Sequence, residues 1–332
     1  LEDGKEKEAK KIFDKWDLDF VVIGKTTKSN NLTLKYDHKI VGEIPIEALA
    51  SKAPVYDRKW IRKKPFKKKF NFKNLKKIKI EDALIKILSS PNHSNKSWIT
   101  NQYDQMVMCD TAQRSGSDAA IIRIHNKNKA IAVSVDSSAN YCKSHPLSGG
   151  KQIVCESWRN LVSVGAKPIA ITNCLNFGNP ENPEIMGQFA ENILGIKEAC
   201  EFLDYPVVSG NVSFYNGTNN NNIYPTPVIG GVGLIKNLNK IQNHKFKKID
   251  SQIMIIGKTF GHLGQSAFIN ELYNVHDGMP PEINLLNEKN NGEMILKLID
   301  SENINSVHDI SSGGIILALA EMSISSQIGI KI

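Results

Sequence analysis

The sequence lacks long apolar runs and paired cysteines. No stretch approaches the roughly 18–20 apolar residues of a membrane-spanning helix, and the charged start LEDGKEKEAKK has no signal-peptide core. The five cysteines among 332 residues are scattered without a CxxC pair, which favours reduced thiols over disulfides or zinc. We therefore expect a cytoplasmic protein that contacts no membrane. Because the chain lacks an initiator methionine and stops within the apolar run IGIKI, we expect a fragment of a longer protein.

Acidic residues are absent from one segment, residues 58–80, whose 12 Lys and Arg residues exceed the chain's whole net charge of +8. Outside this segment, acidic residues outnumber basic ones. A charge confined to one connecting stretch is typical of a solvated linker, and we disfavour the alternative, contact with a nucleic acid. The segment separates residues 1–57 from a predicted domain over 81–242, which is followed by a partial domain over 243–332.

Hydrophobic periodicity predicts strands alternating with helices, which indicates an α/β or α+β layered fold. Asn182-Pro183-Glu184 is a strong helix start, and Gly149 and Gly150 are expected to open another helix. Val207 and Val208 begin a strand that reads as buried. The predicted helices cover 5–16, 46–49, 81–90, 148–165, 182–203, 264–274, 294–299 and 311–322. The predicted strands cover 20–25, 32–45 (as a pair), 118–124, 129–136, 168–172, 207–211, 226–235, 251–258 and 306–310.

Complete nucleotide motifs are missing as well. The stretches VVIGKTT (21–27) and MIIGKTF (254–260) resemble a P-loop but have Asp19 and Gln252 where its first glycine is needed. The glycines of IGGVGLI (229–235) lie within a predicted strand, which argues against a dinucleotide fingerprint.

Small, oxygen-bearing residues gather at predicted strand ends, where ligands of layered α/β sheets commonly bind. Such side chains suit Mg²⁺ shared with nucleotide phosphates, and glycines allow close approach of backbone N–H groups. The alternative is that these residues only form turns. They are Asp136, Asn173, Asn176, Gly210, Asn211 and Ser213.

A second candidate lies near the C-terminus, where Asp309 precedes Gly313 and Gly314 at a predicted helix start. Such a start can bind an anion, although capping alone explains it equally well. His145 and His308 are each expected to be structural, and no nucleophile–base pair can be assigned.

Several stretches together resemble one family in the same order along the chain. They are SDAAIIRI, PLSGGKQIVCESWRNLVSVGAKPIAITNCLNFGNPENPEIMGQF, EACEFLDYPVVSGNVSFYNGT, YPTPVIGGVGLI and SVHDISSGGIILALAEM. They are similar to the second half of the synthetase subunit of phosphoribosylformylglycinamidine synthases. WDLDFVVIGKTT and IPIEALASKAPVYDR resemble the end of the family's first half.

This resemblance implies a duplicated architecture of aminoimidazole ribonucleotide synthetase-like (PurM-like) domains, truncated here. Residues 1–57 would end the first half's second domain, residues 81–242 would form the third domain, and the rest would begin the fourth. The implied reaction is ATP-dependent amidation of formylglycinamide ribonucleotide through an iminophosphate, with Mg²⁺. Its ammonia would come from a glutaminase, either a separate subunit with a small bridging subunit or a fused domain.

The family's motifs place ATP contacts at Asn173 and Gly210, a Mg²⁺ ligand at Asn211 and a substrate contact at Ser213. Asp118, Asp136, Asp309, Gly313 and Gly314 are weaker candidates. The family's catalytic histidines lie in the first half, so no catalytic residue is expected in this chain.

Two positions and one stretch depart from the family's pattern. Asn173 stands where the family usually has Asp, Ser312 also replaces a common Asp, and the polar stretch after Asp136 is altered to SSANYCKSH. Two alternatives stay open: another ATP-using enzyme of the superfamily, or a non-catalytic half that binds nucleotide or supports assembly.

Overall fold

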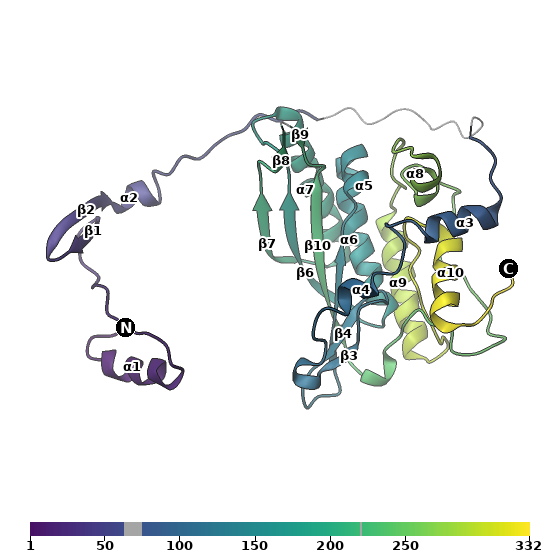
Figure 1. Ribbon diagram of the computed structural model, residues 1–332, viewed down its shortest axis with the longest axis horizontal. Coiled ribbons are helices and arrows are strands. Elements are labelled where there is room, and N and C mark those ends of the chain that lie inside the picture. The colour runs from purple at the N-terminus through teal and green to yellow at the C-terminus, as the bar shows by residue number, and fades with distance from the viewer. Residues whose placement is uncertain (63–74, 220) are drawn as a thin grey trace. The chain divides into compact units, whose positions relative to one another are not determined.

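The computed structural model describes residues 1–62, 75–219 and 221–332, so most of the predicted basic linker lies outside the described residues. Two compact units divide the chain, Leu1–Asp57 and Arg58–Ile332. Figure 1 labels the elements of both units in chain order.

The first unit contains helix α1 (Glu6–Lys15), the antiparallel strands β1 (Asn31–Tyr36) and β2 (Lys39–Pro45), and the short helix α2 (Ile46–Leu49). These elements confirm the predicted helices and the predicted pair of strands. The predicted strand over 20–25 is wrong, since its residues form no regular element and its apolar side chains Val21 and Ile23 are exposed.

The second unit is built on a six-stranded mixed sheet, in the order β3-β4-β5-β10-β6-β7. All neighbouring strands are antiparallel except β6 and β7, which are parallel. Since β10 runs antiparallel to both β5 and β6, strands β5, β6 and β7 end at the same edge of the sheet. The strands are β3 (Thr111–Gln113), β4 (Ala120–Arg123), β5 (Ala130–Asp136), β6 (Lys167–Asn176), β7 (Val207–Ser213) and β10 (Thr226–Ile235), with a separate two-residue pair, β8 (Gly217–Thr218) and β9 (Asn221–Asn222).

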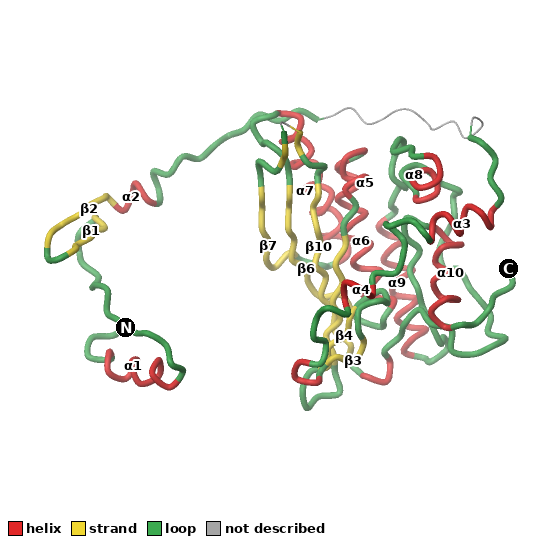
Figure 2. The backbone as a smooth tube through the Cα atoms, viewed as in Figure 1, coloured by secondary structure: helices red, strands yellow, loops and turns green. Residues whose placement is uncertain are grey.

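Two long helices, α6 (Pro146–Ser163) and α7 (Pro183–Leu203), cover one face of this sheet, as the ribbon in Figure 1 and the red helices beside the yellow strands in Figure 2 show. Their apolar side chains join those of the strands in one core, which includes Trp158, Ile171 and Ile229. The mixed layers confirm the predicted fold class. The remaining helices are α3 (Ile80–Leu88), α4 (Ser97–Thr100), α5 (Ala139–Ser144), α8 (Ala267–Tyr273), α9 (Leu285–Asp300) and α10 (Gly314–Ser326).

Helix starts follow the predicted chemistry in one case and depart from it in another. The Asn182 side chain accepts a hydrogen bond from the Glu184 N–H and Pro183 is the first helical residue of α7, as predicted. Helix α6, however, begins at Pro146, where the His145 side chain accepts from the Ser148 N–H. The prediction that Gly149 and Gly150 open α6 is therefore wrong.

These glycines serve helix packing instead. A Cβ at Gly150 would lie 2.3 Å from the carbonyl oxygen of Asn192, and one at Gly195 would lie 2.1 Å from that of Leu147. Because neither position has a side chain, α6 and α7 pack with their backbones in close contact.

The C-terminal part of the second unit is helical where it is regular. Two predicted strands, 251–258 and 306–310, do not form. A strand needs a neighbouring ladder of hydrogen bonds. Val307 donates its N–H to the Asn243 carbonyl, but residues 306–310 join no strand of a sheet. Helices α3, α8 and α10 pack together in a second, smaller core through Ile87, Ala267 and Leu317.

The opposite face of the sheet, here called the open face, is exposed and changes in character from β4 to β7. Ile122, Ile131 and Val135 are exposed apolar residues on β4 and β5, whereas β6 and β7 carry polar residues at the paired positions. Strand β7 is an edge strand, and Val208 is 70% exposed, so the expectation of a buried strand is wrong. None of the helices in the described ranges is long and apolar enough to cross a membrane.

Candidate functional site

The parallel pairing of β6 and β7 brings the main predicted site residues together. Asn173 lies opposite Gly210, Cys174 opposite Asn211, and Asn176 opposite Ser213. Because side chains alternate between the two faces of a sheet, the first pair faces the helices and the other two pairs face the open side.

On the helix-facing side, Asn173 and Gly210 fit each other closely. A Cβ at Gly210 would lie 2.2 Å from the Asn173 Oδ1 atom, so any larger residue there would displace this side chain. Strand β10 pairs Ile229 with both Asn173 and Asp136. One row across the sheet therefore contains Asp136, Ile229, Asn173 and Gly210.

On the open side, three polar pairs follow one another along β6 and β7. The Thr172 and Ser209 hydroxyl oxygens are 2.7 Å apart, and the Asn211 amide nitrogen lies 3.9 Å from Sγ of Cys174. Sequence reasoning did not identify Thr172, Ser209 or Cys174. A signal existed, because residues two positions away along a strand face the same side as Asn211.

The turn after β7 fixes the last of these pairs. The Asn216 side chain bonds both the carbonyl and the hydroxyl of Ser213, and it also bonds the carbonyl of Phe177, just beyond β6. Phe177 in turn donates its N–H to the Ser213 carbonyl, at 2.9 Å. The ends of β6 and β7 are thus tied together by a residue that sequence reasoning missed.

Asp136 ends β5 at the same edge, as predicted, and has an unusual environment. Its carboxylate accepts hydrogen bonds from Ser134 (2.9 Å) and Asn160 (2.7 Å). Burial, together with repulsion by Glu156, outweighs these bonds and raises the Asp136 pKa to about 7. The side chain is therefore partly protonated near neutral pH.

Asp118, His308 and Asp309 form a separate cluster whose ligand atoms lie within 4.8 Å of one another. The His308 Nδ1 atom is 2.7 Å from Asp118 Oδ1, and Nε2 is 3.1 Å from Glu321 Oε2. Burial alone would lower the His308 pKa, but these two bonds outweigh it and raise the pKa to about 10. With its proton bound, the His308 imidazole donates from both ring nitrogens, so it acts as the counter-ion of Asp118 and Glu321.

Arg159 of α6 links this cluster to the helices. Its guanidinium contacts Glu156 at 2.9 Å, Glu288 of α9 at 3.0 Å and Asp309 at 3.6 Å. Burial and the charge of Glu156 raise the Asp309 pKa well above its ordinary value. Gly313 and Gly314 follow at the start of α10, where Gly314 has a φ of +73°.

The open side of β6 and β7 offers Mg²⁺ neutral ligands only, and Asn211 is the one that the family resemblance singles out. The amide nitrogen of Asn211 is turned toward Cys174, which leaves its oxygen for a cation. Protein-bound Mg²⁺ usually takes one or two carboxylates plus substrate phosphates, and the neighbouring residues Thr172, Cys174 and Asn176 carry no carboxylate. Asn211 therefore suits an ion that nucleotide phosphates hold in large part.

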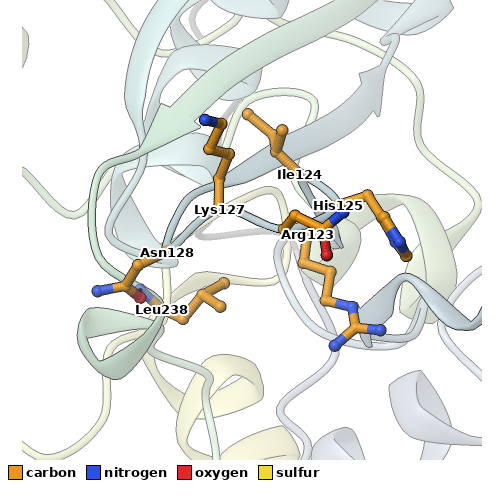
Figure 3. Close-up of a pocket in the computed structure, with 7 residues that line it drawn as sticks. Arg123, Ile124, His125, Lys127, Asn128 and Leu238 are labelled. Carbon is orange, nitrogen blue, oxygen red and sulfur yellow. Dashed lines mark hydrogen bonds between the residues drawn. The ribbon is translucent and has the colours of Figure 1, made fainter.

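The pocket drawn in Figure 3 does not add to this site. It is lined by the turn between β4 and β5 and by Leu238. The Lys127 and Arg123 side chains point in different directions, and Arg123 is paired with Asp110 at 2.8 Å. Its charges therefore do not converge on an anion, and it is lined by none of the predicted site residues.

Comparison with known families identifies the class of protein. Residues 116–235 match the AIR synthase related protein, N-terminal domain, and residues 250–332 match the AIR synthase related protein, C-terminal domain. The chain therefore belongs to the AIR synthase related proteins. Within this class, it is a homologue of phosphoribosylformylglycinamidine synthase subunit PurL. The family resemblance found in the sequence is thus confirmed.

The extent of the match is the same in two curated relatives. The chain is 57% identical over 330 residues to PurL of Pelagibacter ubique and 44% identical over 332 residues to PurL of Azorhizobium caulinodans. The alignments cover 99% and 100% of the chain but only 45% of each relative. The chain therefore spans about half the length of these curated relatives.

Solved structures of Thermotoga maritima PurL share the fold. The structure complexed with ATP has a TM-score of 0.55 and 30% identity, over 72% of this chain and 37% of its own. The one complexed with FGAR has a TM-score of 0.54 and 26% identity, over 82% and 37%. The PurLQS structure has a TM-score of 0.51 and 31% identity, over 65% and 33%.

Proposed function

We propose that this chain contributes to an ATP-dependent C–N ligase that converts formylglycinamide ribonucleotide (FGAR) to formylglycinamidine ribonucleotide in purine biosynthesis. The homologous PurL proteins and the ATP and FGAR complexes of the Thermotoga maritima protein support this proposal. The observation that carries it is the pairing of β6 with β7. This pairing places Asn173 beside Gly210 on the helix-facing side of the sheet, and Asn211 and Ser213 on the open side near the end of the same strand.

The proposed reaction has two steps. ATP transfers its γ-phosphoryl group to the amide oxygen of the substrate, which gives an iminophosphate and ADP. Ammonia then adds to the imidate carbon, and loss of phosphate and a proton leaves the amidine. Both steps need the phosphate charge to be neutralised, and Mg²⁺ provides this neutralisation when it is bound.

Four residues of the chain have proposed binding roles. Asn173 and Gly210 contact ATP, Asn211 is one Mg²⁺ ligand, and Ser213 contacts FGAR. Asp136 lies in the same row as Asn173 but is separated from it by β10. We assign no catalytic group to this chain. His145 caps α6 and His308 is bonded on both nitrogens, which supports structural roles for both.

Partners follow from the same homology. The PurLQS structure supports association with a glutaminase subunit and a small bridging subunit. The exposed apolar residues Ile122, Ile131 and Val135 on the open face support packing against a further PurM-like domain. No observation in the described residues favours a membrane or a nucleic acid as partner.

One observation favours a second candidate, a half that binds nucleotide without supporting turnover. Asn173 is neutral where the family usually has a carboxylate, and no charged residue occupies the paired positions beside it, Gly210 and Ile229. A weaker hold on Mg·ATP is the expected consequence.

The test uses a chimera in which this chain replaces its matched segment in Pelagibacter ubique PurL, assayed with FGAR, Mg·ATP and ammonium chloride. We expect amidine and phosphate from the chimera and none from the chain alone. Circular dichroism and thermal melting show whether the chimera folds as the parent protein does. A folded chimera that binds ATP without forming the amidine would favour the non-catalytic half, and robust turnover by the isolated chain would contradict the proposed division of the site.

A further inference from the structure

The hydroxyl group of Ser213 is oriented by its neighbour in the turn, Asn216. Both side chains are partly buried. The Asn216 amide nitrogen lies 3.0 Å from three oxygens: the carbonyl of Phe177, the carbonyl of Ser213 and the hydroxyl of Ser213. Its amide oxygen lies 3.2 Å from the same hydroxyl.

These contacts fix which way the amide group of Asn216 points. A backbone carbonyl can only accept a hydrogen bond, so the group facing Phe177 and Ser213 must be the NH₂. Reversing the amide would place its oxygen against two carbonyl oxygens. The two hydrogens of the NH₂ group are thereby directed at the carbonyls, and the amide oxygen remains an acceptor beside the Ser213 hydroxyl.

The orientation of the amide determines that of the hydroxyl. A serine has one O–H to donate and two lone pairs to accept with. The Asn216 amide oxygen lies within hydrogen-bond distance of the Ser213 hydroxyl, at 3.2 Å, so the hydroxyl hydrogen has an acceptor within the turn. The shared contact with the NH₂ group uses at most one lone pair, and the other stays available to a ligand.

We infer that Ser213 binds its ligand as a hydrogen-bond acceptor and that Asn216 is the positioning residue that imposes this polarity. The ligand group at Ser213 is then an N–H or O–H, such as a substrate amide or a ribose hydroxyl, and not a carbonyl or an ionised phosphate oxygen. This inference rests on the proposed function, because it takes Ser213 as a substrate contact.

The rest of the turn supports a fixed geometry. Tyr215 adopts a left-handed backbone with φ of +59°, and its N–H donates to the Gly178 carbonyl at 3.0 Å. The Asn216 N–H donates to the Phe177 carbonyl at 3.2 Å, and its own carbonyl accepts from the Ile223 N–H at 3.2 Å. Backbone bonds therefore hold the turn on both sides of the Asn216 side chain.

The experiment compares FGAR with analogues that each lack one donor: N-methylated at the formyl amide, or O-methylated at either ribose hydroxyl. The ribose-linked amide is left unmethylated, because its N–H proton is lost when the iminophosphate forms. In the chimera, one analogue should raise the KM about tenfold, the effect of one lost hydrogen bond. Ser213→Ala should raise the KM for FGAR by a similar factor and remove the penalty of that analogue, whereas Ser213→Thr, which keeps the hydroxyl, should retain it.

Asn216→Ala should reduce the same penalty, because the freed hydroxyl can rotate and donate, with the KM for ATP unchanged. Asn290→Ala, at an exposed position of α9, is the matched control. A merely structural role of Asn216 would raise the KM for FGAR and for the analogue equally and leave their ratio unchanged. Should Asn216→Ala fail to fold, Ser213→Ala still tests whether Ser213 accepts a hydrogen bond from the ligand, since it removes no backbone contact.

A penalty that persists in Ser213→Ala for every analogue would overturn the inference, as would the absence of any penalty in the unsubstituted chimera. In both cases FGAR turnover by the chimera would continue. Failure of the proposed function differs, because then the unsubstituted chimera forms no amidine from FGAR.

Discussion

Single residues at the site differ in how far the sequence could predict them. Asn173, Gly210, Asn211 and Ser213 were singled out by residue type and order, and the structure places them on paired strands, while their roles stay predictions. Asn216 was not predicted, because its positioning role depends on three hydrogen bonds that form only when the turn folds. Many Asn residues form hydrogen bonds of this kind in turns, so residue type alone does not distinguish Asn216 from them.

The absence of a carboxylate at Asn173 gives the first prediction at this scale. In the chimera, Asn173→Asp should lower the KM for ATP by about three- to tenfold at saturating Mg²⁺, because charge-assisted contacts are roughly twice as strong as neutral ones. Steady-state kinetics with varied ATP measures this, with Asn290→Asp as the control for added charge. If turnover and ATP affinity stay unchanged, the carboxylate is dispensable here.

His308 gives a prediction about pH. Its folded-state pKa of about 10 lies above the ordinary value of 6.5, so the folded protein holds the proton more tightly than the unfolded chain. The resulting stabilisation is fully present below pH 6.5 and is lost as the pH rises toward 10. The charged or titratable groups facing His308 are Asp118, Glu321, Asp309 and His244.

Urea unfolding of the chain at pH 6, 8 and 10 measures this dependence. We expect His308→Gln to reduce the free energy of unfolding at pH 6 by roughly 3 kcal/mol and to flatten its decline toward pH 10. His262→Gln is the control, because the His262 imidazole bonds the backbone carbonyls of Gly264 and Met279 and no carboxylate in the described residues. An equally steep decline in the His308 variant would show that other groups cause it.

At the scale of elements, helices were easier to predict than strands. The Asn182-Pro183-Glu184 start and the 3.6-residue periodicity of α7 are local signals, and the helix begins as they indicate. Residues 20–25, 251–258 and 306–310 have the apolar composition of strands but do not form them. A strand is stabilised by its neighbours, and composition does not reveal whether a neighbour is there.

The contact between α6 and α7 gives a prediction for elements. Gly150→Ala should lower the free energy of unfolding by roughly 2–4 kcal/mol, because its Cβ would meet the carbonyl of Asn192 at 2.3 Å and the amide of Ile196 at 3.1 Å, both backbone groups. Gly329→Ala, where a Cβ meets nothing within 4 Å, is the matched control. Thermal melting of both variants measures the difference, and equal melting temperatures would show that the helices can move apart without cost.

For the molecule as a whole, the sequence indicated the layered fold and the family, while spatial relations had to come from the structure. The common edge of β5, β6 and β7 follows from β10 being inserted between β5 and β6, an order that the chain sequence does not reveal. The same is true of the link between Arg159, Glu288 and Asp309, which joins residues up to 150 positions apart. Local patterns predict elements, but the partners of a buried charge depend on the tertiary fold.

The tie between β6 and β7 through Asn216 also bears on the thermodynamics of binding. A loop that orders only when its ligand arrives opposes association with the entropy that it loses. Here, folding already orders the turn that contains Ser213, so ligand binding at this edge of the sheet does not carry that entropic penalty.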